Sequence, residues 1–302
     1  MTVFTSDDLS AVRSLLFTPA DRPERFSKAV ASGADGVVLD LEDAVAAVAK
    51  TAARDAALNF LAGHADDVLW VLRINHFKTQ AGLEDLLALR RVLRMPAAIM
   101  LPKVESPGEV DAAVAHLHCN GSSPLIVALI ESSRGLGAAD AIAAHPAVGA
   151  LAFGGADLAA DMGAEMAWEP LLFARSRIVQ AAAASQIAAW DVPFLDLRDD
   201  TGLTRETVAA KALGYSAKLA IHPAQVGSIN AVFSPTQRQV ERAQQVVAAS
   251  ARSAGGVCVV EGKMIDQPVV LAAQRTLQLA RRLGVAQRDA LAGAMSAGAF
   301  AS

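Results

Sequence analysis

The sequence predicts an α/β fold, a (β/α)8 (TIM) barrel followed by a short C-terminal strand–helix appendage. Short apolar runs alternate with longer, alanine-rich amphipathic stretches along most of the 302 residues. The runs are continuously apolar, which is typical of strands buried on both faces of a parallel sheet. Eight such runs within about 235 residues match the repeat number and the size of a TIM barrel.

The eight predicted strands are followed by helical patterns, which supply the crossovers that parallel strands need. Ala44–Leu61 and Arg205–Leu213 are two of these helical patterns. The predicted strands are Ser14–Pro19, Gly36–Leu41, Val68–Asn75, Ala97–Pro102, Pro124–Glu131, Val148–Gly155, Ala188–Leu195 and Ala217–Pro223. A doubly wound open sheet is the alternative, but no G-x-G-x-x-G motif follows the first run, so the barrel is favoured.

The chain divides into a barrel domain over residues 1–254 and a C-terminal appendage over residues 255–302. A helix over Pro235–Ala254 ends the barrel pattern and is followed by a Gly-Gly break. The appendage then contains a short strand, Val257–Gly262, and a helix, Val269–Leu283. The small-residue tail Ala290–Ser302 has too little apolar surface to order itself, so we expect it to be mobile.

Charge and cysteine content exclude several classes of partner. Twenty-seven basic and thirty-one acidic residues give a net charge of −4, without the basic footprint of a nucleic-acid or anionic-membrane binder. Cys119 and Cys258 lack a metal-cage spacing and favour a reducing compartment. No basic segment followed by an apolar run opens the chain, so we expect a cytoplasmic protein that does not enter membranes.

Polar residues stand at the ends of most predicted strands. They are Asp40, Glu42, Asp43, Arg73, Asn75, Lys103, Glu131, Asp157 and His222. In TIM barrels the carboxyl ends of the strands form the active-site face, so these side chains should meet in one cavity. For any one of them a polar loop residue is the simpler interpretation, and Asp43 alone could cap the next helix. The convergence of the set favours a site.

Glu131 and Asp157 are the strongest candidates for metal ligands. They are one β/α unit apart, which puts them on neighbouring strand ends. Two carboxylates offer hard oxygen ligands and favour Mg²⁺, which keeps water or takes substrate oxygens in its other positions. Zinc is not favoured, because no Cys or His cluster has the spacing it needs. The alternative is a pair of salt bridges to Lys103 and Arg73 without a metal.

Basic residues near these acids suggest how an anionic substrate is held. Arg73 offers forked donors to a carboxylate or to a developing oxyanion. Arg22 and Lys28 follow the first strand, beside Phe17 at its end, and suit a phosphate-bearing substrate at the rim. A solvated helix face is the alternative for Lys28. His222 is interpreted as a wall or orienting residue of the substrate site rather than as a base.

Several ordered sequence blocks carry a resemblance to a known family. The blocks are RSLLFTPADRPERFSKA, ADGVVLDLEDAV, VLRIN, IMLPKVE, LIESSRGL, LAFGGADL, KLAIHPAQV and EGKMIDQPV. With them the sequence resembles the citrate lyase β-subunit group of the HpcH/HpaI aldolase family, which includes malyl-CoA and citramalyl-CoA lyases. The resemblance covers Arg13 to the region of Leu271. The chain is short between Asp157 and Trp190, which indicates a compact member similar to citrate lyase subunits.

The resemblance implies roles for individual residues. Glu131 and Asp157 would hold Mg²⁺, and Arg73 would contact the bound keto acid or thioester oxygen. The first-loop residues that would handle the CoA portion are Phe17, Arg22 and Lys28. Asp266 would reach the site of a neighbouring subunit and exchange a proton with the acetyl-CoA methyl carbon. Members of the family are commonly trimers or hexamers, so a homo-oligomer is expected.

The reaction implied by the resemblance is Mg²⁺-dependent retro-Claisen or aldol cleavage of a malyl, citramalyl or citryl thioester into acetyl-CoA and a 2-keto acid. Three alternatives stay open at this point. The same pocket could hydrolyse malyl-CoA as a thioesterase. The chain could be a citrate lyase β-subunit that acts only on a thioester bound to an acyl-carrier partner. A pyruvate aldolase for sugar-like substrates is disfavoured by the basic first loop and by Asp266.

Overall fold

The computed structural model describes residues 5–64, 68–92, 95–117, 123–253 and 258–284. The chain forms two compact units, residues 1–233 and residues 234–302, which are described separately below. The Gly-Gly break and the small-residue tail named above lie outside the described residues.

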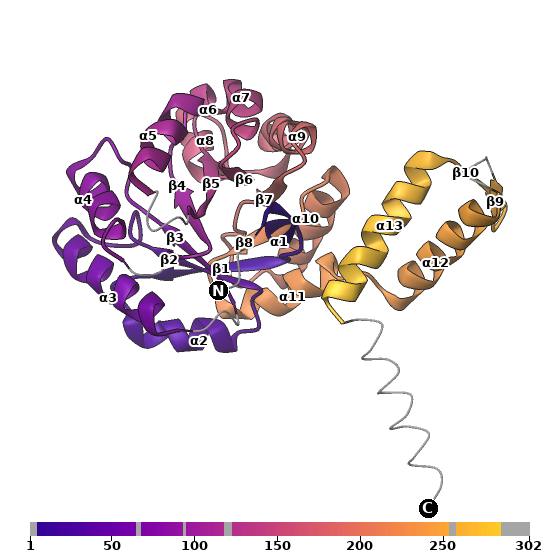
Figure 1. The fold of residues 1–302 in the computed structure, drawn as a ribbon, viewed down its shortest axis with the longest axis horizontal. Helices are drawn as coiled ribbons and strands as arrows, with labels where there is room; N and C mark the ends of the chain where they lie inside the picture. The colour runs from indigo at the N-terminus through magenta and orange to yellow at the C-terminus, as the bar shows by residue number, and fades with distance from the viewer. Residues whose placement is uncertain (1–4, 65–67, 93–94, 118–122, 254–257, 285–302) are drawn as a thin grey trace, which may run out of the picture. The chain divides into compact units, whose positions relative to one another are not determined.

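The first unit is a closed barrel of eight parallel strands in sequence order, so the predicted fold class is confirmed (Figure 1). The strands are β1 (Ser14–Pro19), β2 (Gly36–Asp40), β3 (Leu69–Arg73), β4 (Ala98–Leu101), β5 (Leu125–Ile130), β6 (Val148–Phe153), β7 (Ala188–Asp191) and β8 (Ala217–Ala220). Each corresponds to one of the predicted apolar runs. β8 pairs with β1 and closes the barrel.

Helices precede the first strand, connect successive strands and follow the last strand of the barrel. They are α1 (Ser6–Ser10), η1 (Pro23–Arg25), α2 (Phe26–Ala31), η2 (Ala47–Ala49), α3 (Lys50–Gly63), α4 (Gln80–Leu89), α5 (Pro107–Leu117), α6 (Ser133–Gly137), α7 (Ala139–Ala143), α8 (Gly155–Met162), α9 (Trp168–Ala184), α10 (Asp200–Leu213) and α11 (Pro223–Phe233). The two longer helical patterns singled out in the sequence correspond to α3 and α10.

Alternate residues of each strand belong to two different cores, as strands buried on both faces require. Leu15 belongs to an inner cluster that fills the barrel, whereas Leu16 belongs to the outer cluster between strands and helices. Helix α1 contributes Leu9 to the inner cluster, and the indole of Trp190 donates to the Leu9 carbonyl at 3.3 Å. These contacts hold α1 against the interior of the barrel.

The second unit consists of α12 (Gln237–Arg252), the hairpin strands β9 (Cys258–Val260) and β10 (Lys263–Ile265), and α13 (Gln267–Arg282). A small apolar core that includes Val246, Ile265 and Val270 holds the two helices and the hairpin together. This packing groups α12 with the hairpin, so the units divide at residues 233 and 234 rather than at 254 and 255. The second hairpin strand has no counterpart among the elements that the sequence predicted.

Within the described part of the chain, no helix is both long enough and apolar enough to cross a membrane.

Candidate active site

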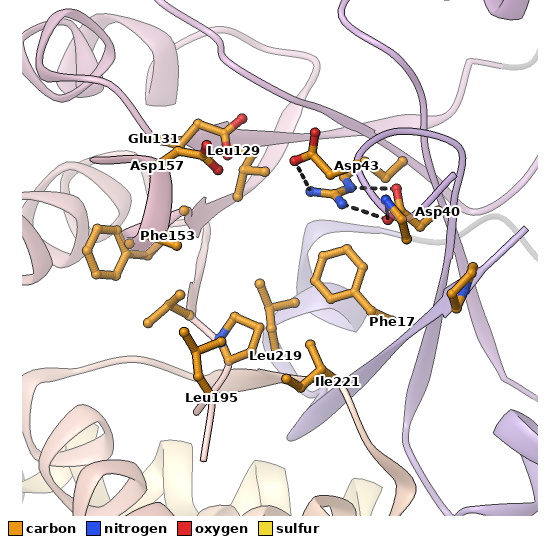
Figure 2. Close-up of a pocket in the computed structure, with 18 residues that line it drawn as sticks. Phe17, Asp40, Asp43, Leu129, Glu131, Phe153, Asp157, Leu195, Leu219 and Ile221 are labelled. Atoms are coloured by element: carbon orange, nitrogen blue, oxygen red, sulfur yellow. Dashed lines mark hydrogen bonds and ion pairs between the residues drawn. The ribbon is translucent and has the colours of Figure 1, made fainter. Parts of the chain in front are cut away.

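A pocket of about 440 Å³ opens at the carboxyl ends of the barrel strands (Figure 2). Its walls come from the ends of β1, β2, β3, β5, β6, β7 and β8 and from the residues that follow them. Apolar side chains such as Phe17, Leu129 and Leu219 form much of the lining, and a few charged groups are set among them. The strand-end rule for TIM barrels therefore describes the site of this chain.

The structure brings Glu131 and Asp157 into this pocket. Glu131 follows β5 and is 3% exposed, whereas Asp157 is exposed in the first turn of α8. Figure 2 shows their carboxyl groups side by side at one edge of the pocket. The two acids thus occupy neighbouring positions on the strand-end face, as their spacing in the sequence predicted.

A glycine at position 154 makes room for the Glu131 carboxylate. A Cβ atom built on Gly154 would collide with the Glu131 Cβ and would lie 2.7 Å from Glu131 Oε2. The turn between β6 and α8 therefore passes directly against the carboxylate, and only a glycine allows this approach.

The environment of Glu131 disfavours its negative charge. Burial is the largest cause, and the nearby Glu42 and Asp157 carboxylates add to it, so the pKa of Glu131 is raised to about 8. The Lys103 backbone N–H, which donates to Glu131 Oε1 at 2.7 Å, offsets this only in part. The positive charge of Lys103 also favours the ionised form of Glu131, but it does not outweigh burial and the two neighbouring carboxylates.

Arg73 lines the pocket but is already paired with carboxylates at the end of β2 and in the loop that follows it. Its Nε and Nη2 donate to the two oxygens of Asp40 at 2.7 and 2.6 Å, and its guanidinium lies over the Phe17 ring at 4.8 Å. Burial alone would lower the pKa of Arg73, but the hydrogen bonds and charge of Asp40 raise it well above its usual value. Arg73 is therefore a fixed cation that an incoming anion shares with Asp40.

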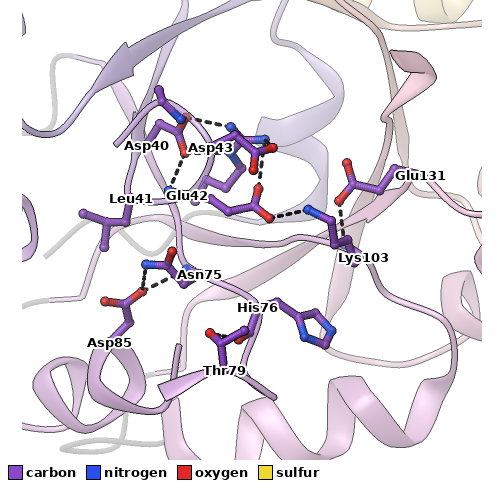
Figure 3. A network of polar contacts seen from close by, with 12 residues as sticks. Asp40, Leu41, Glu42, Asp43, Asn75, His76, Thr79, Asp85, Lys103 and Glu131 are labelled. Atoms are coloured by element: carbon purple, nitrogen blue, oxygen red, sulfur yellow. Dashed lines mark hydrogen bonds and ion pairs between the residues drawn. The ribbon is translucent and has the colours of Figure 1, made fainter. Parts of the chain in front are cut away.

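A chain of polar contacts links Arg73 to Glu131 (Figure 3). Arg73 Nη1 lies 3.2 Å from Glu42 Oε2, an ion pair that lacks hydrogen-bond geometry. Glu42 Oε1 accepts from the Lys103 ammonium at 2.7 Å, and the Lys103 backbone contacts Glu131. Burial raises the pKa of Glu42, although Arg73 and Lys103 oppose the effect. The metal-free alternative expected Arg73 and Lys103 to form salt bridges with Glu131 and Asp157. Instead, Arg73 pairs with Asp40 and Lys103 pairs with Glu42.

Lys103 holds its place in this chain with an unusual backbone. Its φ of +53° lies in the left-handed region that non-glycine residues rarely adopt. This conformation presents its N–H to Glu131 while its ammonium reaches Glu42. The sequence marked Lys103 as a strand-end residue and as a salt-bridge partner in the metal-free alternative, but not as a backbone donor to Glu131.

The loop after β2 is held by a third cation. The Lys50 ammonium donates to the carbonyl oxygens of Leu41 and Glu42 at 2.7 and 2.5 Å. Asp43, in the same loop, lines the pocket and lies 3.9 Å from Arg73 Nη1. We call the charged residues around the pocket the pocket cluster. Its members are Asp40, Glu42, Asp43, Lys50, Arg73, Lys103, Glu131 and Asp157.

The pocket cluster contains five carboxyl groups and three cations, which is an excess of two negative charges when every member is ionised. This excess and the raised pKa of Glu131 fit a divalent cation at the Glu131–Asp157 pair. No group of three or more His, Cys, Asp or Glu side chains suited to a metal occurs among the described residues. The fit therefore depends on the two-carboxylate pair, with water or substrate oxygens as further ligands.

Other predicted site residues lie outside the pocket lining. Arg22 is exposed in the loop after β1, with its Nε 3.9 Å from Asp21, and Lys28 is exposed on α2. His222 is exposed at the start of α11, where its Nδ1 accepts from the Ala224 N–H at 3.2 Å. Asp266 belongs to the second unit, where it caps α13 by accepting from the Val269 N–H at 3.4 Å.

Comparisons with known proteins agree with this architecture. Residues 13–223 match the HpcH/HpaI aldolase/citrate lyase family, and residues 168–285 match a family of carbon–carbon bond lyases of the TIM-barrel fold. The citrate lyase subunit beta-like protein of Mycobacterium tuberculosis is 38% identical over 282 residues, which cover 91% of this chain and 96% of that protein.

Two further comparisons concern a named lyase and a solved structure with ligands. The mitochondrial citramalyl-CoA lyase of Homo sapiens is 32% identical over 292 residues, which cover 89% of this chain and 85% of that protein. The crystal structure of the M. tuberculosis protein CitE in complex with magnesium, acetoacetate and coenzyme A has a TM-score of 0.76 and 36% identity. The match covers 90% of this chain and 99% of that one.

Proposed function

Because the chain belongs to the HpcH/HpaI aldolase/citrate lyase family, we propose that it is a Mg²⁺-dependent carbon–carbon lyase of 3-hydroxyacyl-CoA thioesters. Its products would be acetyl-CoA and a 2-keto acid. The observation that carries the proposal is the pocket cluster, in which the Glu131 and Asp157 carboxylates face the pocket together and acids outnumber cations. The relative named as a citramalyl-CoA lyase and the related structure with magnesium and coenzyme A support the same reaction class.

In this proposal the two acids and the arginine divide the chemistry. Glu131 and Asp157 would hold Mg²⁺, which would supply a Lewis acid for the substrate oxygens. The 3-hydroxyl would lose its proton to solvent, its oxygen would form the C3 carbonyl of the 2-keto acid, and the electron pair of the broken C2–C3 bond would pass into the thioester, where negative charge develops on oxygen. Arg73, held rigidly by Asp40, stabilises that charge, and a well-aimed donor of this kind contributes about 3 kcal/mol.

The remaining predicted residues have roles at the rim of the pocket. β1 ends at Pro19, which lines the pocket, so the following loop with Arg22 borders its mouth. Arg22 in this loop and Lys28 on α2 would bind the phosphates of CoA, and Phe17 would contact the acyl end of the thioester. His222 follows Ile221, another lining residue after β8, the strand next to β1, and would orient the substrate at that part of the rim.

Asp266 would complete the reaction by delivering a proton to the enolate carbon. Its carboxylate is exposed on the second unit, and the family resemblance assigns such an aspartate to the site of a neighbouring subunit. We therefore include a homo-oligomer, a trimer or hexamer, in the proposal. Asp266→Asn should lose turnover, and mixing it with an Arg73→Ala variant should restore part of the activity if subunits exchange residues.

The pocket lining favours malyl or citramalyl thioesters over citryl thioesters. The cluster is rich in acids, and its pocket-facing guanidinium is already paired with Asp40, so an additional substrate carboxylate would meet repulsion. Apolar residues such as Val192 and Leu195 line the same pocket and suit a hydrogen or methyl substituent at C3. The proposed substrates therefore release glyoxylate or pyruvate.

A panel of malyl-CoA, citramalyl-CoA and citryl-CoA, with and without Mg²⁺, tests the proposal. We expect cleavage of the first or second ester, dependent on Mg²⁺, with acetyl-CoA and the matching keto acid as products. Release of free CoA without acetyl-CoA would instead identify a thioesterase. Activity only on a carrier-bound thioester would identify a citrate lyase subunit.

A further inference from the structure

The wall of the pocket after β7 has no regular secondary structure. Residues 192–195 form this segment, which we call the wall segment, and Val192, Pro193 and Leu195 line the pocket. Figure 2 draws Leu195 and Ile221 on the side away from Glu131 and Asp157. An irregular segment has few backbone partners of its own, so side chains must fix its position.

The first carbonyl of the wall segment is held by a buried lysine. Lys218 of β8 is fully buried, and its ammonium donates to the Val192 carbonyl at 2.7 Å. The same ammonium binds Asp191 Oδ2 at 2.6 Å and Glu206 Oε1 at 2.8 Å. The Lys218 ammonium therefore has three acceptors, and its orientation toward Val192 is fixed.

An arginine connects the same charges to a second pocket residue. Arg175 of α9 donates from Nε to Asp191 Oδ1 at 3.0 Å, and its guanidinium lies over the rings of Trp168 and Phe153 at 4.6 and 5.2 Å. Phe153 lines the pocket. We call Arg175, Asp191, Glu206 and Lys218 the wall cluster. Each of its two cations thus contacts one pocket-lining residue, Lys218 contacting Val192 and Arg175 contacting Phe153.

A buried glutamine holds a second carbonyl of the wall segment. Gln225 of α11 is 3% exposed, and its Nε2 donates to the Phe194 carbonyl at 2.7 Å. Its Oε1 accepts from the backbone N–H groups of Ile221 and His222 at 3.0 and 3.3 Å. One side chain thereby ties the wall segment to the loop after β8, which also lines the pocket through Ile221.

We propose that Lys218 and Gln225 are positioning residues that hold the wall segment against the substrate and so determine which C3 substituent the pocket accepts. This inference rests on the proposed lyase function and deepens it. Neither side chain lines the pocket; both act through carbonyl groups of residues that border it. A wall held at two points discriminates a hydrogen from a methyl group better than a loose one, since rejection requires that it cannot retreat.

Gln225→Met is the main test, because it removes both hydrogen-bonding ends with little change in volume. The measurement is kcat/KM for malyl-CoA and for citramalyl-CoA, expressed as a ratio. We expect the preference of the unaltered protein for one ester to fall about tenfold, since a methylene in a fitted pocket is worth ten- to two-hundredfold. Lys218→Met should shift the ratio in the same direction and also lower stability, because it uncouples Asp191 and Glu206.

Asn230→Leu is the matched control on the same helix. Asn230 accepts from the Ser14 hydroxyl at 2.7 Å and donates to the Gly33 carbonyl at 2.9 Å, both near the amino ends of strands. Its variant should leave the ratio unchanged. An unchanged ratio in Gln225→Met, with or without a lower melting temperature, would overturn the inference and leave Gln225 a structural residue only.

A second measurement separates this inference from the proposed function. Glyoxylate and pyruvate differ by the same methyl group, and calorimetric titration of each in the presence of Mg²⁺ reports on the wall without turnover. If the protein cleaves neither ester, the lyase proposal fails. A shift of about tenfold in the ratio of the two keto-acid affinities in Gln225→Met would still support the positioning role, and an equal ratio would contradict it.

Discussion

The barrel contains two clusters of carboxylates and cations, the wall cluster and the pocket cluster, which differ in net charge. The wall cluster has two carboxylates and two cations, and three of its four members are at most 1% exposed. The pocket cluster has five carboxylates and three cations, and one of its carboxyls, Glu131, has a pKa raised to about 8. The balanced cluster has no net charge of its own, whereas the unbalanced one has negative charge left for a cationic ligand.

This difference teaches how to separate structural from functional charge in a barrel. Burial alone does not mark the site, because the wall cluster is the more deeply buried of the two. A buried ion pair without excess charge has no need of a further ion, and its carboxylates already have partners. Surplus negative charge in a cavity is costly until a cation binds there, and we take this property as the indication of a functional site in the pocket.

The largest effect is expected where the unbalanced cluster meets the cation. Asp157→Asn should lower kcat by about a thousandfold, since a Lewis acid supplies several kcal/mol of transition-state stabilisation. Its thermal unfolding should stay near that of the unaltered protein, because Asp157 is exposed. Steady-state kinetics and calorimetric titration with Mg²⁺ measure the two consequences.

Asp161→Asn provides the matched control for this change. Asp161 is exposed on the same helix and accepts from the Ser133 N–H at 2.7 Å. It should keep its activity and its Mg²⁺ affinity. Near-normal turnover in Asp157→Asn would remove this residue from the metal site, and with it the main support for the lyase proposal.

The balanced cluster should respond in stability. Asp191→Asn leaves Arg175 and Lys218 without their shared carboxylate, and breaking a buried pair in this way costs about 3–5 kcal/mol. Urea denaturation measures the loss. Asp140→Asn disrupts a single hydrogen-bonded pair with Arg177 in which the Asp140 side chain is 59% exposed, and it should cost no more than about 1 kcal/mol. Equal costs at the two sites would contradict the role assigned to the wall cluster.

The pH dependence of stability reports on the protonation of the Glu131 carboxyl group. The folded-state pKa of Glu131, raised chiefly by burial from 4.5 to about 8, means that the folded protein holds a proton that the unfolded chain releases. Between these pH values, the Glu131 contribution therefore lowers the free energy of unfolding as pH rises, by up to a few kcal/mol. Bound Mg²⁺ should remove this loss by stabilising the ionised carboxylate.

Glu131→Gln isolates that contribution. The variant carries no titrating group at position 131, so its stability should fall less between pH 5 and 8, roughly the interval set by the two pKa values. The comparison is urea unfolding of both proteins across this range, without Mg²⁺. Parallel pH profiles would mean that the Glu131 carboxyl is already ionised in the folded protein, and the inferred demand for a cation would be wrong.

Much of the fold was predictable because it depends on local apolar patterning. Each of the eight continuous runs became a strand, since a strand buried on both faces has no polar alternation to obscure it. Helix α1 and strand β10 were missed for the opposite reason. α1 has five residues and is held by Leu9 against the barrel interior, while β10 depends on its pairing with β9. Such short elements are fixed by tertiary contacts that no local pattern records.

The site was predictable in its location but not in its connections. Strand-end position placed Glu131, Asp157, Arg73 and Phe17 around one pocket. It could not predict that Arg73 is paired with Asp40, because that pairing depends on side-chain geometry across two strands. Sequence spacing also does not predict which carbonyl a buried Lys or Gln contacts. The only indication of the wall cluster and of Gln225 in the sequence was the presence of polar residues among apolar ones.

The smallest effect concerns the backbone of Lys103, which connects the two halves of the pocket cluster. Its φ of +53° strains a non-glycine residue, so Lys103→Gly should be more stable than Lys103→Ala by about 1 kcal/mol. Both variants lose the ammonium that binds Glu42 but keep the N–H that serves Glu131, so their activities should fall alike. Urea midpoints and steady-state rates of the two variants provide the comparison.

Gln186, with a φ of +57° in the turn between α9 and β7, offers the same strain away from the carboxyl ends of the strands. Gln186→Gly should likewise exceed Gln186→Ala in stability, but both should keep full activity. Relief of backbone strain would then raise stability equally at positions 103 and 186. Only the loss of the Lys103 charge from the pocket cluster would lower activity. Equal activity losses at 103 and 186 would show instead that backbone strain, not charge, governs the pocket.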